Sequence, residues 1–219
     1  MAAPTEIQVM SSAAIKASYL EIVPQFERAS GHKVTTRWIP GVDLFKRVME
    51  GETSDLVIMQ AGDIDKLIAA GRIKTGSRAD LAKSSVGVAV RAGAPRPDIS
   101  TADALKRALL AAKGVAYSTG PSGVYILELF ERLGIAVALQ GKTRQVKGEP
   151  AGAPVARGEA EIAFQQVSEL LPVPGIDFIG KLPADIQKIT IFSAGMQANA
   201  REPDAARTLI DFIQSPAAA

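Results

Sequence analysis

Short apolar runs alternate with helix-length amphipathic stretches along nearly the whole of this 219-residue chain. Such alternation requires mostly parallel sheets joined by right-handed helical crossovers, so an α/β fold is expected. Helices are predicted over residues 15–26, 44–49, 64–68, 105–110, 126–133 and 203–213, with a helical turn at 154–157. Strands are predicted at residues 7–10, 33–38, 55–59, 86–90, 115–117, 145–146, 161–164 and 186–192.

Composition excludes several classes of protein. The 25 basic and 23 acidic residues are scattered with no basic run of five, which disfavours a nucleic-acid-binding surface. No apolar stretch reaches the ~18 residues of a membrane span. With no cysteine and one histidine, a transition-metal site and a Ser-His-Asp triad are both disfavoured, and we expect no metal and no cofactor. That histidine, His32, follows a helix-ending glycine and is expected at the surface.

Familiar nucleotide and hydrolase motifs are missing. Gly141–Thr143 has the end of a phosphate-binding loop, but Ala136 stands where that motif needs its first glycine. The sequence contains neither a G-x-S-x-G elbow nor a G-x-G-x-x-G turn.

Two turns between a strand and a helix carry hydroxyl and glycine residues. Ligands of parallel sheets bind outside the carboxyl ends of the strands, and helix N-termini there attract anions. The first turn supplies Ser11, Ser12 and Ala13. The second lies between Ser118 and Tyr125 and supplies Ser118, Gly120, Ser122 and Gly123. The alternatives are that the serines only cap helices and that the second segment is an ordinary Gly/Pro turn.

Polar residues also follow three other predicted strands. Gln165 and Gln166 arrive abruptly at the end of the strand 161–164, where side-chain amides suit carboxylate recognition, and Glu169 follows them. Glu149 lies in a glycine-bearing turn after the strand 145–146, and Gln60 follows the strand 55–59. A strand that ends at the surface and a solvated loop acid are the alternative interpretations.

One recognisable pattern runs through residues 7–12, 24–34, 54–59, 65–71, 158–164 and 203–215. These segments resemble a known family, the molybdate-binding-protein-like group of type 2 periplasmic binding proteins. The resemblance implies a two-lobed fold whose first lobe, 1–84 and 189–219, is interrupted by a second lobe, 85–188. It also implies that Ser11 and Ser12, and the turn from Ser118 to Ser122, contact a ligand over which the lobes close.

Two departures from molybdate binders favour a different anion. Pro40–Asp43 stands where those proteins have a serine-bearing turn, and Gln165 and Gln166 stand where they have a tyrosine. Both changes remove hydroxyl donors, and an ionised Asp43 or Glu169 near the site repels a dianion. An organic carboxylate is therefore expected at least as readily as an oxyanion.

A further set of residues consists of Ser11–Ser12 and the segments 91–95, 117–118, 121–125 and 164–175. This set is similar to a narrower subgroup that includes aconitate isomerase, an enzyme built on the binding-protein scaffold. Three functions stay open: a solute-binding protein for ABC-type uptake, an isomerase that shifts an allylic proton, and an effector-sensing domain. An isomerase would use Glu149, or else Glu169, as its base, with Ser12, Ser122 and Gln165 holding the substrate.

The sensor is disfavoured because no helix-turn-helix segment precedes residue 1. Residues 1–6 lack the features of a signal peptide and look like an initiator Met on a mature sequence. The expected setting is the periplasm. The chain is expected as a monomer with a small anionic ligand and an ABC transporter permease as partners, and with no nucleic-acid partner.

Overall fold

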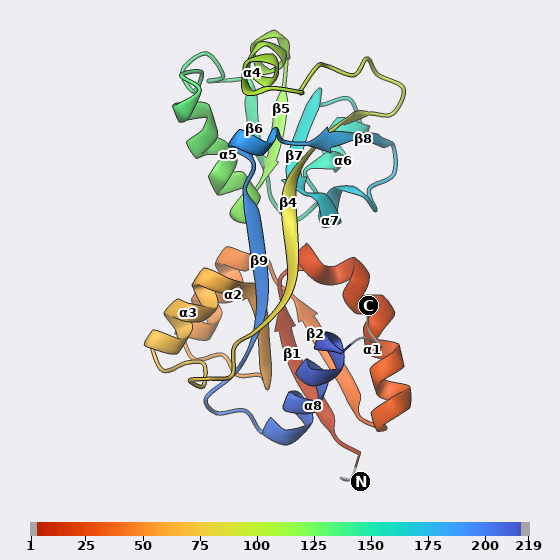
Figure 1. Ribbon diagram of the computed structural model, residues 1–219, viewed down its shortest axis with the longest axis vertical. Coiled ribbons are helices and arrows are strands. Elements are labelled where there is room, and N and C mark those ends of the chain that lie inside the picture. The colour runs from red at the N-terminus through yellow and green to blue at the C-terminus, as the bar shows by residue number, and fades with distance from the viewer. Residues whose placement is uncertain (1–3, 216–219) are drawn as a thin grey trace. The chain divides into compact units, whose positions relative to one another are not determined.

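The computed structural model describes residues 4–215, which form two compact units. Unit 1 is made of the chain up to Lys83 and from Ile191 onward, so it is discontinuous in sequence, and unit 2 is Ser84–Thr190. Two long strands, β4 (Ala79–Arg91) and β9 (Ile189–Met196), contribute residues to both units (Figure 1).

In unit 1 the neighbouring strands lie in the order β2-β1-β3-β9 (Figure 1). The strand β1 runs parallel to both of its neighbours, and β9 lies antiparallel to β3. The register pairs Ser11 with Trp38 on one side and with Ile58 on the other, so the carboxyl ends of these parallel strands share one edge. The bounds of the strands are β1 Glu6–Ser11, β2 Lys33–Trp38 and β3 Leu56–Gln60.

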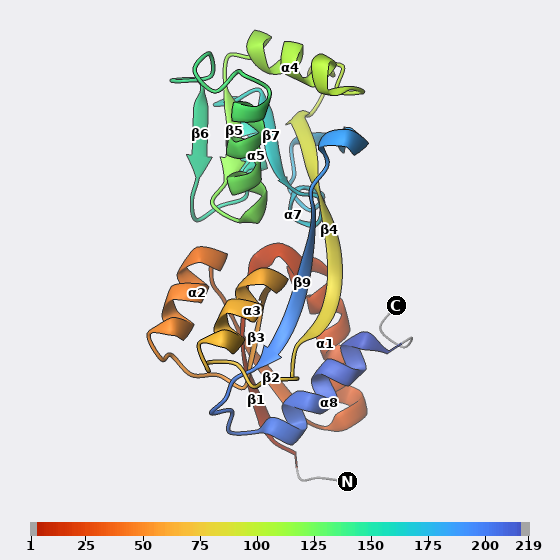
Figure 2. The same ribbon diagram turned by 60° about the vertical axis from the view of Figure 1, so that its left-hand side comes forward.

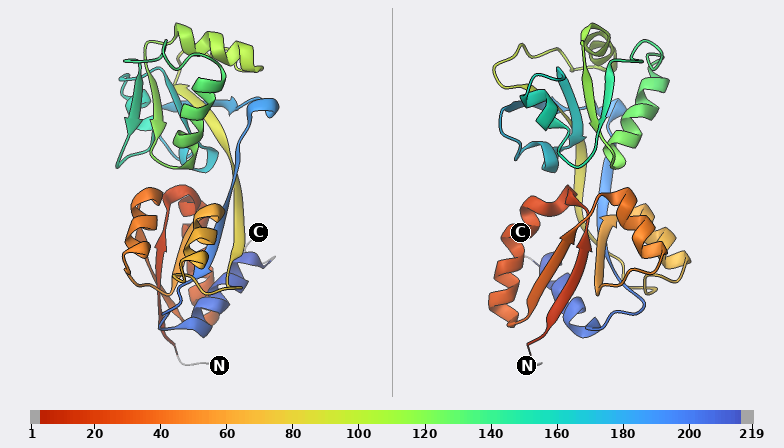
Figure 3. Two further views of the ribbon diagram at one scale, coloured as in Figure 1. Left: turned by 90° about the vertical axis from the view of Figure 1, so that its left-hand side faces the viewer. Right: turned by 180° about the vertical axis from the view of Figure 1, so that it is seen from behind.

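Helices cover both faces of the unit 1 sheet (Figure 3). Leu56 and Ile58 of β3 pack on one side with α1 and α8, while Val57 and Met59 pack on the other with α2 and α3. These four side chains are at most 1% exposed, because successive residues of a strand point to opposite faces. The helices are α1 Lys16–Ser30, preceded by the 3₁₀ turn η1 Ala13–Ile15, α2 Gly41–Met49, α3 Ala61–Ala69 and α8 Pro203–Gln214.

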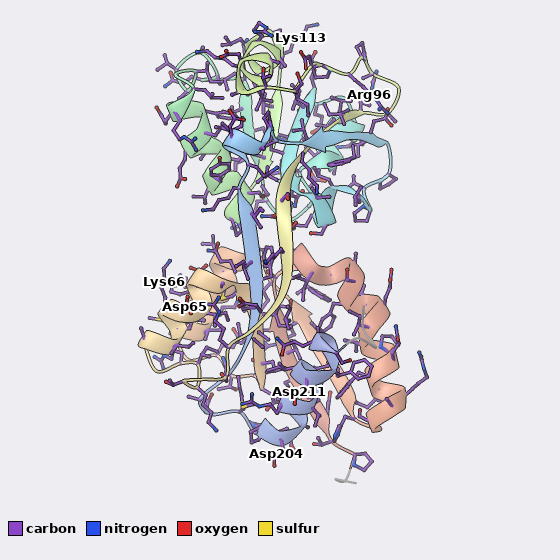
Figure 4. All side chains as sticks on the ribbon, viewed as in Figure 1. Asp65, Lys66, Arg96, Lys113, Asp204 and Asp211 are labelled. Atoms are coloured by element: carbon purple, nitrogen blue, oxygen red, sulfur yellow. The ribbon has the colours of Figure 1, made fainter. Side chains whose placement is uncertain are left out.

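A buried carboxylate joins the start of β3 to the segment before α8. Asp55 is 2% exposed and accepts backbone N–H bonds from Gln8 at 2.7 Å, Arg201 at 2.8 Å and Glu202 at 2.9 Å. These bonds satisfy donors that would otherwise be buried without partners. At the surface of the same unit, Arg78 binds Asp65 of α3, which Figure 4 labels, at 2.8 Å.

Unit 2 has a mixed sheet in which β5 lies between β6 and β7 and runs parallel to both (Figure 2). The strand β4 lies antiparallel to β7 and to β8. The parallel pairing sets Ser118 of β5 opposite Val146 of β6, and Tyr117 opposite Phe164 of β7. The carboxyl ends of these three strands therefore share one edge. The strands are β5 Val115–Ser118, β6 Thr143–Val146, β7 Ile162–Gln166 and β8 Ile176–Lys181.

Two apolar clusters enclose the unit 2 sheet. Larger side chains such as Tyr117 and Phe164 pack with α4 and α5, whereas Ala116 and Ala163, which point the other way, pack against α6 and α7. Small residues on that second face let its short helices approach the strands closely. The helices are α4 Ala102–Ala111, α5 Pro121–Arg132, α6 Gly152–Ala156 and α7 Val167–Leu170, with a 3₁₀ turn η2 at Ala184–Ile186.

The α/β class and each of the predicted helices and strands are confirmed, with ends that shift by a few residues except at the starts of β4 and α5, which begin at Ala79 and Pro121 instead of residues 86 and 126. The strand β8 is an addition that the sequence did not indicate. The expected surface position of His32 is wrong: the residue is 6% exposed, lies against the Phe26 ring, and its Nδ1 accepts from the Thr5 N–H at 3.2 Å. The left-handed Gly31 (φ 78°) turns the chain back after α1, which places the imidazole in the core instead of in solvent.

Within residues 4–215, no helix is long and apolar enough to cross a membrane. The same residues hold no group of three or more His, Cys, Asp or Glu side chains that could bind a metal ion.

Candidate functional site

The turn after β1 contains a buried hydroxyl without a protein partner. Ser12 is 7% exposed, its backbone N–H donates to the Ile58 carbonyl at 2.9 Å, and its side chain does not cap η1. Among the described residues, its Oγ is the buried side-chain atom that lacks a hydrogen-bond partner. Because the side chain makes no cap hydrogen bond, the interpretation that this serine only caps a helix is excluded. An unpaired buried hydroxyl costs about 1–3 kcal/mol of folding free energy.

The other residues expected on this edge of unit 1 differ in their roles. Ser11 is fully buried and its Oγ donates to the Ser12 carbonyl at 3.0 Å. Ala13 is exposed and offers only backbone groups. Gln60, at the end of β3, donates from Nε2 to Asp63 at 2.6 Å, so its amide is engaged by the first turn of α3.

A surface hollow of about 480 Å³ lies elsewhere in unit 1, at the edge where β1 and β2 begin. It is separate from the turn after β1, because Glu6 and Lys33 start the strands that end at Ser11 and Trp38. The hollow is lined by Pro4, Thr5, Glu6, Glu27, Gly31, Lys33, Val34 and Thr35.

The turn after β5 holds a pair of buried hydroxyls. Ser118 Oγ and Ser122 Oγ lie 3.1 Å apart, and Ser118 Oγ also accepts from the Gly120 N–H at 3.3 Å. Ser118 is 7% exposed and Ser122 is fully buried. The contact between the two oxygens uses one of the two hydroxyl protons, so the pair can donate the second proton to a ligand.

Gly123 brings the start of α5 against the end of β5. A Cβ at this position would lie 1.7 Å from the Ser118 carbonyl oxygen, far inside any permitted contact. The glycine is therefore required for close approach, and this approach is what sets the Ser122 hydroxyl beside Ser118.

Gln165 lies at the carboxyl edge of the unit 2 sheet. Its Oε1 accepts from the Ala151 backbone N–H, after β6, at 2.6 Å. Gln165 is 4% exposed. The oxygen end of this amide is thus engaged by the protein, and the direct ligand contact expected for Gln165 stays a prediction.

Gln166 is fully buried and binds the residues where the chain enters and leaves unit 2. With its amide oxygen accepting from Thr190 Oγ1 at 3.1 Å, its nitrogen faces Ser84 Oγ at 3.0 Å and the carbonyls of Ser84 and Ser85 at 3.3 Å. This amide too is engaged inside unit 2, so ligand contact by Gln166 stays a prediction.

Comparison with known proteins identifies the family of this chain. Residues 7–219 match the family described as bacterial extracellular solute-binding protein. The chain belongs to this family.

Two relatives and one solved structure bear on the kind of ligand. The chain is 41% identical to aconitate isomerase of Pseudomonas sp over 221 residues, covering 98% of this chain and 84% of that protein. It is 27% identical to the molybdate-binding protein of Azotobacter vinelandii, covering 97% and 86%. The solved periplasmic molybdate-binding protein of that organism superposes with a TM-score of 0.81 at 17% identity, covering 97% and 94%, and shows the same type 2 binding-protein fold.

Glu169 is the titratable side chain whose environment fits proton transfer near neutral pH. Desolvation by burial raises the pKa of Glu169 to about 7, and the hydrogen bond from Gln165 offsets part of that rise. The carboxyl is partly buried on α7, directly beyond the end of β7. A carboxyl group with this pKa can both accept and return a proton at physiological pH.

Glu149, which the sequence offered as the first choice of base for an isomerase, has the opposite environment, and its pKa is lowered. Arg157 binds both carboxylate oxygens of Glu149, each at 2.8 Å, and this contact lowers the pKa of Glu149. About a third of the side chain is exposed, so there is little desolvation to oppose the arginine. Glu149 forms part of a surface ion-pair network with Arg157 and Glu159, which makes it a poor general base.

Sequence reasoning missed the groups that hold these candidates in place. Ala151 anchors Gln165 through a backbone N–H, Thr190 anchors Gln166, and Arg157 binds Glu149 across eight residues of sequence. A backbone donor leaves no trace in residue type, so the Ala151 contact could not be found without the structure. Arg157 could have been suspected from its charge alone.

Proposed function

We propose that this chain is an extracytoplasmic solute-binding protein for a small anion, an organic carboxylate or an oxyanion, and that it serves ABC-type uptake from the periplasm. The observation that carries the proposal is the buried Ser12 hydroxyl without a protein partner, at the carboxyl edge of parallel strands. An anion accepting from Ser12 Oγ removes the cost of that unpaired group.

The chemistry of both turns supports an anion as the ligand. The segments from Ser11 to Ala14 and from Ser118 to Gly123 contain hydroxyls and backbone N–H groups and no carboxylate. We propose that the turn after β1 and the turn after β5 each donate hydrogen bonds to the bound anion. Neutral donors at such turns bind anions without a cationic side chain.

Organic di- and tricarboxylates are expected to stabilise the protein more than molybdate does. The first turn of α2 presents Val42 and Asp43, so it lacks the hydroxyl donors that would line a tetrahedral oxyanion. A ligand at 100 times its Kd adds about 2.7 kcal/mol, or roughly 5–10 °C in Tm for a protein of this size. Thermal-shift measurements with carboxylates, molybdate, tungstate, sulfate and phosphate decide the class. A large molybdate shift with none from carboxylates would reverse the assignment.

Ser12→Ala and Ser122→Ala are each expected to weaken binding of the ligand found in that screen by about ten- to a hundredfold. Each substitution removes one hydroxyl donor to an anion, worth ~1.5–3 kcal/mol. Ser12→Ala should leave Tm unchanged or slightly higher, because its Oγ has no partner to lose in the free protein. Isothermal titration calorimetry measures the affinity, and a thermal melt measures the stability.

Ser54→Ala is the matched control for these serine variants. Ser54 is equally buried at 7% exposure, but its Oγ donates to the Leu56 carbonyl at 2.9 Å, at the start of β3 instead of its end. It should therefore lose stability and keep affinity. Unchanged affinity in both Ser12→Ala and Ser122→Ala would remove the two turns as ligand sites.

A second candidate function is isomerisation of an aconitate-like tricarboxylate by an allylic proton shift. Two observations favour it: the 41% identity to aconitate isomerase over 98% of this chain, and the pKa of about 7 at Glu169. In this candidate Glu169 carries the proton, while Ser12 and Ser122 hold substrate carboxylates. Incubating the protein with trans-aconitate and following the cis isomer distinguishes an isomerase from a protein that only binds.

A further inference from the structure

Lys16 carries a positive charge that the protein does not pair with a carboxylate. The residue begins α1, four positions after Ser12, and its side chain is exposed. Its ammonium lies over the Trp38 ring, 5.4 Å from the ring centroid, which is a cation–π contact. No ion pair joins Lys16 to a carboxylate of residues 4–215. The ammonium can therefore bind an anion without first leaving a protein carboxylate.

The Trp38 ring holds this ammonium beside the turn after β1. Trp38 ends β2 and pairs in register with Ser11, and the N–H of the next residue, Ile39, donates to the Ser11 carbonyl at 2.9 Å. The buried Tyr19 ring packs edge-on against the Trp38 ring, with centroids 5.4 Å apart, and so fixes its position. Because helical side chains lean toward the N-terminus of their helix, Lys16 leans toward this same edge of the sheet.

Two different anion-binding groups therefore lie at one edge of unit 1. The Ser12 hydroxyl is neutral, buried and, among residues 4–215, without a hydrogen-bond partner. The Lys16 ammonium is a point charge with three donors on a flexible stem. Its contact with a ring at the surface is weaker than a charge-assisted hydrogen bond to a carboxylate, so a ligand carboxylate can draw it away from Trp38.

We propose that Lys16 binds a second carboxylate of a ligand whose first carboxylate accepts from Ser12, so that unit 1 recognises a di- or tricarboxylate in preference to a one-centre oxyanion. The inference rests on the anion-binding function proposed above and deepens it by naming the ligand class. In the free protein the Trp38 ring holds the ammonium near the turn. When the ligand binds, the ammonium moves from the ring to the carboxylate.

Lys66 is a matched comparison within unit 1, and Figure 4 labels it. Its ammonium also lies over an aromatic ring, that of Phe45, 5.8 Å from the centroid. Unlike Lys16, it forms an ion pair with a protein carboxylate, Asp63, at 2.9 Å. Because that ammonium is already paired, Lys66→Met should leave anion affinity unchanged.

Fluorescence titration tests the proposal, because Trp38 is the only tryptophan of the chain and contacts the group in question. The probe is propane-1,2,3-tricarboxylate, which has no double bond and cannot be isomerised. Lys16→Met keeps an apolar chain over the ring and should weaken binding by about ten- to a hundredfold. Lys16→Arg keeps the charge and the ring contact and should recover most of that loss. Thermal melts should give all three ligand-free proteins a similar Tm.

Sulfate is the second probe, because it has one charged centre and no second group for Lys16. Lys16→Met should weaken sulfate binding by about threefold or less, through screened long-range attraction alone. The proposal is overturned if folded Lys16→Met binds the tricarboxylate as tightly as the wild type, or if both probes lose affinity by the same factor. A wild type that does not bind the tricarboxylate overturns it as well. None of these results decides the proposed binding function, which the wider anion screen and the two serine variants test separately.

Discussion

Gly123→Ala is expected to destabilise unit 2 by at least ~3 kcal/mol, lowering Tm by roughly 6–12 °C. The added Cβ would lie 1.7 Å from the Ser118 carbonyl oxygen and 2.7 Å from its carbon, and both contacts are with backbone that cannot rotate away. The start of α5 must then move off the end of β5. The Ser118–Ser122 hydroxyl contact depends on that approach and should be lost with it.

Gly120→Ala is the control for this substitution. It lies three residues earlier in the same turn, but its Cβ would meet Ser118 Oγ at 3.7 Å, an ordinary contact, and its φ of −81° suits any residue. Thermal unfolding and anion affinity of the two variants should therefore separate clearly. A Gly123→Ala protein as stable as Gly120→Ala would mean that the helix does not approach the strand this closely.

The fold could be predicted because burial on both faces leaves a plain signal. The strand β3 is apolar at four successive positions since helices cover both sides, and glycines such as Gly31 mark where helices end. The strand β8 gives no such signal. Five of its six residues, Ile176–Lys181, are only partly buried, and it contains Asp177 and Gly180. An edge strand of this kind cannot be distinguished from a loop by its sequence pattern.

The location of the candidate site could be predicted from the sequence, but the hydrogen bonding and pKa values of its residues could not. Strand-to-helix turns located Ser12 and Ser122, because such turns follow directly from the β-α alternation. Whether Ser12 Oγ caps a helix or stays unpaired depends on the side-chain rotamer and the local backbone, and residue type does not encode either of them. Which of Glu149 and Glu169 has the higher pKa depends on the folded surroundings of each residue. Arg157 lowers the pKa of Glu149, and burial raises the pKa of Glu169.

Glu169→Gln is expected to reduce isomerisation of trans-aconitate by a factor on the order of 10² or more if the chain is an enzyme. The change keeps the shape of the side chain while removing the group that exchanges a proton. Affinity for the substrate should change little, so the loss should appear in kcat and not in KM. Because the base must be ionised, wild-type kcat should rise with pH and level off above about pH 7.

Glu149→Gln is the matched control for catalysis. It removes a carboxylate from the neighbouring turn, but one held by Arg157 in a surface ion pair, where the free-energy cost is small. Turnover should therefore survive Glu149→Gln and fail in Glu169→Gln. The reverse outcome would place the proton carrier on the turn after β6, despite the lowered pKa of Glu149. Wild-type protein that produces no cis isomer over hours at high concentration would end the catalytic candidate, and the binding function would then stand alone.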